Sequence, residues 1–131
     1  MPAMLSFDYA TIRVVPRVDR EEFVNAGVIL FCRERQFLEA RVALDPTRVR
    51  GLYAESDLET IERHLEAVPR ICLGSPHGGP IGALPIHERF HWLVAPRSTV
   101  IQMSPVHAGL CESPNETLAR LFESLVGPKS D

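Results

Sequence analysis

The sequence predicts an α+β fold, a single domain in which a small, mostly antiparallel sheet of about five strands packs against two longer helices and one short helix. Two patterns lead to this class. In the first third of the chain apolar residues alternate with a period of two, as in half-buried strands, and later they recur at helical spacing behind helix-capping residues. With 131 residues, 45% of them hydrophobic, residues 1–131 are expected to form one domain with its own core.

Three predicted strands occupy the first third of the chain. Residues 9–15 and 37–44 alternate apolar and polar side chains, which is typical of strands with one buried face. Residues 23–32 are almost continuously apolar, which fits a central strand covered on both faces. The four residues 33–36 lie between two of these segments, so 23–32 and 37–44 are expected to form an antiparallel hairpin.

The helices are predicted mainly from their capping residues. Asp45 and the proline after it begin a short helix that runs through residue 52. Residues 56–59, Ser-Asp-Leu-Glu, form a capping box for a longer helix, and Pro69 is expected to kink or end it. Residues 113–116 repeat the capping box, and the apolar stripe that follows is expected to end at Gly127.

Residues 74–85 are dense in glycine and proline and are expected to be a loop within the domain. This loop lacks the Lys-Ser/Thr ending of a P-loop and the strand-to-helix setting of a dinucleotide fingerprint. We therefore expect a connector and no phosphate cradle here.

The most explicit catalytic pattern is His-Glu-x-x-His, formed by His87, Glu88 and His91. On a helix it would place two zinc ligands on one face, with Glu88 as the general base and Glu112 or Glu116 as the third ligand. The flanking prolines, the missing polar N-cap and the β-preferring residues after His91 favour a strand, in which the two histidines would not converge. We expect the strand and no bound cofactor, and zinc remains the alternative.

Residues 95–102 are read as the next strand, which begins with Arg97 and Ser98, and His107 follows it in a predicted loop. If the chain folds back, Arg97 would bind a planar anion in a bidentate fashion, with Ser98 or His107 as auxiliary donors. The simpler interpretation is an arginine paired with an acid at a sheet edge.

Arg13 and Asn25 interrupt predicted strands and are interpreted as architectural. Arg13 would project from the open face of the sheet, and Asn25 beside Gly27 indicates a bulge.

Charge and hydropathy exclude two classes of partner. The formal net charge of −3, from 14 Lys and Arg against 17 Asp and Glu, gives no support for nucleic-acid binding. The N-terminus has no secretion signal, and no segment approaches the ~20 apolar residues of a membrane span. We therefore expect a cytosolic protein without a membrane partner. Its three cysteines, Cys32, Cys72 and Cys111, are expected to be buried free thiols because their contexts are apolar.

Three linked segments resemble one bacterial family, the domain of unknown function 3037. They are residues 9–16 (Tyr-Ala-Thr-Ile-Arg-Val-Val-Pro), residues 22–31 (Glu-Phe-Val-Asn-Ala-Gly-Val-Ile-Leu-Phe) and residues 88–99, which contain Glu-Arg-Phe and Ala-Pro-Arg-Ser. The resemblance spans nearly the whole chain and brings no established activity, cofactor or catalytic residue. It implies a small cytosolic bacterial protein, often encoded near a kinase-like protein that resembles the HipA toxin family. The shared pattern does not need both His87 and His91, which argues against zinc.

The sequence thus leads to three hypotheses. The preferred one is a non-enzymatic binding or accessory domain, with that HipA-like kinase as the expected partner, and a sheet edge would also allow a homodimer. The second is the zinc-dependent hydrolase, and the third is an anion or nucleotide binder centred on Arg97. The candidate contact region for a ligand or partner consists of Arg13, Asn25, Arg97, Ser98 and His107.

Overall fold

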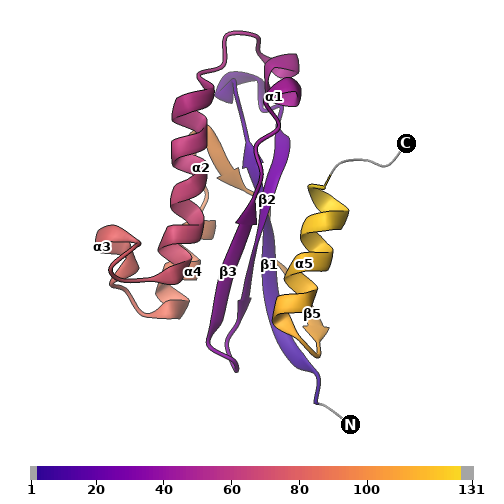
Figure 1. Ribbon diagram of the computed structural model, residues 1–131, viewed down its shortest axis with the longest axis vertical. Coiled ribbons are helices and arrows are strands. Elements are labelled where there is room, and N and C mark those ends of the chain that lie inside the picture. The colour runs from indigo at the N-terminus through magenta and orange to yellow at the C-terminus, as the bar shows by residue number, and fades with distance from the viewer. Residues whose placement is uncertain (1–2, 128–131) are drawn as a thin grey trace.

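The computed structural model describes residues 3–127 and confirms the α+β class (Figure 1). The strands are β1 (Leu5–Val14), β2 (Val24–Cys32), β3 (Phe37–Val42), β4 (Ile101–Met103) and β5 (His107–Cys111). The helices are α1 (Pro46–Leu52), α2 (Leu58–Leu73), α3 (Gly79–Gly82), α4 (Ile86–Val94) and α5 (Pro114–Leu125), and a 3-10 turn, η1 (Val18–Arg20), follows β1.

The five strands form one antiparallel sheet in which β1 is central. β2 pairs with one edge of β1, and β3 pairs with β2 through the predicted hairpin. The other edge of β1 is shared, because β4 pairs with the end of β1 near Val14 and β5 pairs with the end near Leu5. The predicted bulge is confirmed, since the β1–β2 register shifts between Ile12 and Arg13. Next to it, a Cβ on Gly27 would lie 2.6 Å from the carbonyl oxygen of Arg41.

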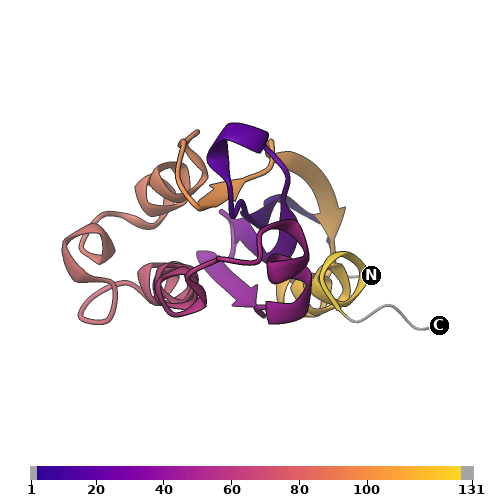
Figure 2. The ribbon, with the colours of Figure 1, turned by 90° about the horizontal axis from the view of Figure 1, so that it is seen from above.

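Helices cover both faces of the sheet. α2 and α4 lie on one side and α5 lies on the other, as both views show (Figures 1 and 2). The even-numbered side chains of β1 from Ala10 to Val14 pack under α2 and α4 with Leu65, Val68 and Phe90. Leu5 and Phe7 face α5 and pack with Leu118. The alternation of β1 therefore divides the interior into two cores, one on each face.

The structure corrects the expectation for residues 86–94, which form the helix α4 and not a strand. Phe90 and Leu93 are buried on its inner face, and the Phe90 ring stacks on Phe31 at a centroid distance of 5.0 Å. Pro85 occupies the N-cap position without a side-chain cap. Burial of one helical face against β2 therefore outweighs the β preference of the residues and the missing cap.

The segment after α4 also differs from the prediction, because only Ile101–Met103 is a strand and the residues before it are irregular. The Thr99 hydroxyl donates to the carbonyl of Ile101, and the Gln102 amide donates to the carbonyl of Thr99. These local hydrogen bonds replace the strand pairing that a longer β4 would make. The loop expected around His107 is instead the strand β5, which pairs with the first half of β1.

Two helix predictions also need correction. α2 does not end at Pro69 but continues to Leu73, and Cys72, beyond the proline, is buried in the core. The N-cap of α2 is Asp57, which accepts from the Thr60 backbone N–H, and not Ser56. Within residues 74–85 the structure places a single helical turn, α3, where only loop was expected.

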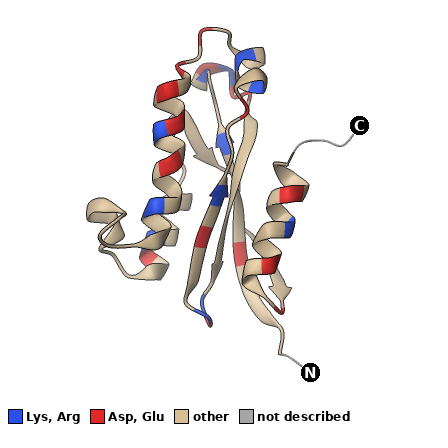
Figure 3. Ribbon diagram, in the orientation of Figure 1, with Lys and Arg blue, Asp and Glu red and all other residues tan. Residues whose placement is uncertain are grey.

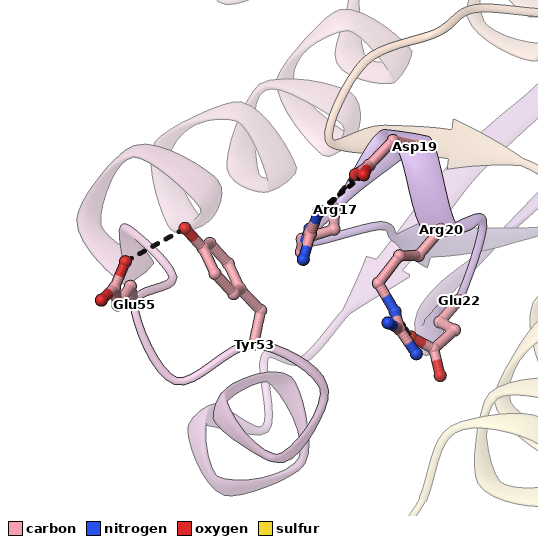
Figure 4. Close-up of polar contacts among 6 residues, drawn as sticks. All are labelled: Arg17, Asp19, Arg20, Glu22, Tyr53 and Glu55. Atoms are coloured by element: carbon pink, nitrogen blue, oxygen red, sulfur yellow. Dashed lines mark hydrogen bonds and ion pairs between the residues drawn. The ribbon is translucent and has the colours of Figure 1, made fainter.

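Charged side chains lie mainly on the helices and connecting segments, and both signs alternate along α2 (Figure 3). Beyond β1, Arg17 contacts Asp19 and Arg20 contacts Glu22, each at 2.6 Å, and the Tyr53 hydroxyl bonds to a nearby carboxylate (Figure 4). These side chains are exposed, so the pairs contribute little to stability. The two arginines are nevertheless neutralised by neighbours in sequence.

Candidate functional site

A groove of about 430 Å³ lies between α2, α4 and β4, and we define it as the α2–α4 groove. Its lining comes from three segments that are distant in sequence: one side of α2, the last turn of α4 with the irregular chain after it, and β4. The lining residues are Arg63, His64, Ala67, Val68, Ile71, Trp92, Leu93, Ala95, Arg97, Thr99, Ile101, Gln102 and Met103. Aliphatic side chains from all three segments therefore meet there with two arginines and a histidine.

Arg97 is held in place by the end of α4. Its guanidinium donates to the carbonyl of Leu93 at 3.2 Å and to the carbonyl of Trp92, so it caps the last turn of the helix. The same group lies over the Trp92 ring, 4.2 Å from the centroid. Burial lowers the pKa of Arg97, but a guanidinium remains charged at neutral pH. The sequence-predicted pairing with an acid at a sheet edge is absent, because Arg97 forms no ion pair within residues 3–127.

Two further groove residues with basic side chains come from α2. Arg63 and His64 are both exposed, and Arg63 makes one hydrogen bond, from its Nη2 to the hydroxyl of Thr60 at 3.3 Å. In the part of the chain that the structure describes, Arg63 has no acidic partner within ion-pair distance. Trp92, the only tryptophan of the chain, is 40% exposed on the opposite wall.

None of the described residues that line the groove is acidic. A guanidinium has five N–H donors, and Arg97 uses two of them on the helix carbonyls. Remaining donors on a preorganised arginine, next to an apolar surface, favour a ligand that combines negative charge with an apolar part. The groove can therefore bind and orient such a group.

The five residues of the sequence-predicted contact region are not brought together. Arg97 lines the α2–α4 groove, whereas Ser98 is exposed in the irregular segment and does not line it. Arg13, Asn25 and His107 project from the side of the sheet that faces α5. The fold-back that would place His107 beside Arg97 does not occur.

On the α5 side, each of the three residues has a local contact of its own. The guanidinium of Arg13 lies over the Phe23 ring, 4.0 Å from its centroid. The amide of Asn25 donates to the carbonyl of Leu125 at 3.2 Å and so caps the end of α5. The His107 ring packs beside Tyr9 at a centroid distance of 5.2 Å. Architectural roles therefore account for the contacts of Arg13 and Asn25.

The helical form of α4 meets the first requirement of the His-Glu-x-x-His pattern. His87 and His91 lie one turn apart and both line a hollow of about 360 Å³, together with Asp8 and Glu34. Glu88 is exposed and does not line this hollow.

The residues predicted as the third zinc ligand do not lie near the two histidines. Glu112 and Glu116 line a different hollow beside α5, on the opposite side of the sheet from α4. Within residues 3–127, no three His, Cys, Asp or Glu side chains are close enough to hold a metal ion. The two histidines alone supply half of a tetrahedral zinc site.

Sequence reasoning missed Arg63, His64 and Trp92 as groove residues. The sequence of α2 contained a signal, because Arg63, Ala67 and Ile71 recur every four residues and so lie on one face of the helix. The small side chain of Ala67 leaves space beside the guanidinium of Arg63. Trp92 gave no signal, because its position depends on α4 being a helix.

Comparison with known proteins places the chain in a family. The sequence model described as "Protein of unknown function (DUF3037)" matches residues 9–126, so the chain belongs to this family. No curated protein and no solved structure gives a significant match. Across residues 3–127, no helix has the length and apolar character needed to cross a membrane.

Proposed function

We propose that this member of the DUF3037 family is a non-enzymatic binding or accessory domain, and that the α2–α4 groove is its contact surface. The observation that carries the proposal is the composition of the groove, an apolar floor beside Arg63 and Arg97, which have no acidic partner within ion-pair distance among the described residues. Contact surfaces of this kind combine buried apolar area with a few directional polar groups.

The first partner to test is the HipA-like kinase that the resemblance to the family implies, in the cytoplasm of a bacterium. A partner protein would place an apolar segment on the groove floor and acidic groups near the two arginines. Trp92 and the arginines belong to the residue types that dominate binding energy in protein interfaces.

The proposal is tested with a variant that fills the groove. Ala67→Glu places a longer, acidic side chain on the groove wall while keeping a good helix former in α2. The matched control is Ala119→Glu, the same change on α5, across the sheet from the groove. We expect the kinase to bind the parent protein and Ala119→Glu alike and to bind Ala67→Glu at least tenfold more weakly, measured by calorimetry. Equal affinity for both variants would contradict the groove as the contact surface.

A zinc-dependent hydrolase is the second candidate, supported by the position of His87 and His91 on one side of α4. It would use Glu88 as the base. Elemental analysis of the purified protein, with His91→Ala and Glu88→Gln, separates it from the binding proposal. We expect less than one zinc per chain in all three. One zinc per chain, lost in His91→Ala and kept in Glu88→Gln, would favour the hydrolase.

A further inference from the structure

We propose that the α2–α4 groove recognises a carboxylate joined to an apolar body. This inference rests on the proposed function, because it names the chemistry that the groove accepts. The same groups recognise the carboxylate of a free small molecule and that of an acidic side chain or chain end of a partner protein, and the experiment below separates these two sources.

The anion-binding part is Arg97. Its guanidinium is fixed between the Trp92 ring and the carbonyls at the end of α4, so little side-chain entropy remains to be lost on binding. It is also partly desolvated, as the lowered pKa indicates. Two of its five N–H groups donate to helix carbonyls, so three donors remain for a ligand. A planar carboxylate matches paired N–H donors of a guanidinium better than a spherical anion does.

A second positively charged side chain, Arg63, also favours an anionic ligand. Arg63 lines the same groove from α2, is exposed, and has only the Thr60 hydroxyl as a hydrogen-bond partner among the described residues. His64 lies beside it on the same wall of the groove. A cationic ligand would meet these groups without a lining acid to compensate, so the groove discriminates against amines.

The apolar part of the ligand would lie on the floor formed by Ile71, Leu93 and Met103. These side chains belong to three different elements, and Leu93 is 1% exposed, so the floor is continuous with the core. The groove volume of about 430 Å³ falls within the range of about 300–1,000 Å³ found for ligand sites. An ion as small as acetate would leave this floor uncovered and would bind poorly.

Trp92 allows a direct test, because the only tryptophan of the chain lines the groove. We would titrate the full-length protein with 4-phenylbutyrate and follow Trp92 emission together with heat release. The matched probes are 4-phenylbutylamine, which reverses the charge, and acetate, which removes the apolar body. We expect saturable binding of 4-phenylbutyrate, at least tenfold weaker binding of both matched probes, and weakening by added salt.

Two arginine variants connect the binding to the proposed residues. Arg97→Lys keeps the charge but loses the fork of donors, and Arg63→Gln removes the charge at an exposed position. We expect each to weaken 4-phenylbutyrate binding about tenfold. Arg120→Gln, on α5, is the matched control and should bind normally. Circular dichroism and the melting temperature establish that each variant is folded. Unchanged affinity in the folded Arg63→Gln and Arg97→Lys variants would overturn the proposal.

Further arms identify the source of the carboxylate and separate the two proposals. Weaker kinase binding to Arg63→Gln and Arg97→Lys, with competition by 4-phenylbutyrate, would support a carboxylate supplied by the partner protein. Binding of 4-phenylbutyrate without any effect on the kinase would support a free small molecule. If Ala67→Glu blocks the kinase while both arginine variants bind it normally and no probe binds, the contact surface stands and the carboxylate inference fails.

Discussion

The ends of α4 and α5 lie on opposite sides of the sheet, and each is capped by a side chain from outside the helix. At α4 the guanidinium of Arg97 donates to the carbonyls of Trp92 and Leu93. At α5 the amide of Asn25 donates to the carbonyl of Leu125. Both capping residues were candidate contacts on sequence grounds, and both satisfy carbonyls that a helix leaves unpaired.

The two caps differ in the charge and the hydrogen-bond donors that each side chain can still offer to a ligand. Asn25 is half-buried in β2, donates to the helix through its neutral amide, and borders a groove of about 520 Å³ on the α5 side. Arg97 has N–H donors beyond the two that cap α4, and it borders an open groove. Both caps therefore border a groove, but only Arg97 adds a positive charge and further N–H donors to it, because a guanidinium has more donors than one helix end requires.

The largest effect is expected from removing the residue that makes α4 a helix. Phe90→Ala deletes a ring that is 2% exposed and stacked on Phe31, so we expect a loss of about 3–5 kcal/mol in the free energy of unfolding. Urea denaturation measures the change. His91→Ala, at an exposed position of α4, is the control and should change stability little. A small loss for Phe90→Ala would mean that α4 does not depend on the core for its stability.

The cap of α4 should have the next largest effect. Arg97→Ala removes two charge-assisted hydrogen bonds and the contact with Trp92, so we expect a loss of about 1–2 kcal/mol, reduced by solvent exposure. Arg97→Lys should recover part of this stability. Thermal denaturation of both variants provides the measurement, and equal stability of the parent and Arg97→Ala would show that the cap is not needed.

The cap of α5 should contribute less. Asn25→Ala removes one neutral hydrogen bond to the carbonyl of Leu125, for an expected loss of about 1 kcal/mol. Because Asn25 lies across the sheet from the α2–α4 groove, ligand binding at the groove should be unaffected. A change in affinity for 4-phenylbutyrate in Asn25→Ala would break the proposed separation between the two sides.

The smallest effect concerns pH on the α2 side of the sheet. Burial raises the pKa of the Cys72 thiol to about 12, against an ordinary value of 9.0. The neutral thiol therefore stabilises the folded state below pH 9, and this contribution is lost as pH rises from 9 toward 12, because the unfolded thiol ionises first. At pH 9.5 we expect this group to reduce stability by less than about 1 kcal/mol relative to pH 7.

The measurement compares the pH dependence of unfolding between the parent protein and Cys72→Ala, with reductant present. The cavity left by alanine lowers stability at every pH, so only the difference in slope reports on the thiol. Parallel profiles between pH 7 and pH 9.5 would contradict the raised pKa of Cys72.

Sequence patterns predicted the hairpin, the bulge beside Gly27, α1 and α5 because those signals are local. Alternation, capping residues and turn residues act within a few positions, so one segment suffices to read them. The prediction failed at residues 86–94 and at β5, where the deciding contacts come from elsewhere. α4 depends on packing against Phe31, and β5 depends on pairing with β1.

For the candidate site, the sequence alone identified Arg97 and the chemistry that an arginine supplies. It grouped Arg97 with Arg13, Asn25 and His107, which the sheet places on its other side. Which side chains share a surface is a matter of strand register and helix packing between segments far apart in the chain. The sequence by itself therefore determined the fold class, the N-caps of α1 and α5 and the available chemical groups. Only the tertiary structure decided that Arg97 meets Arg63 and Trp92 in one groove, because three distant segments must pack together to form it.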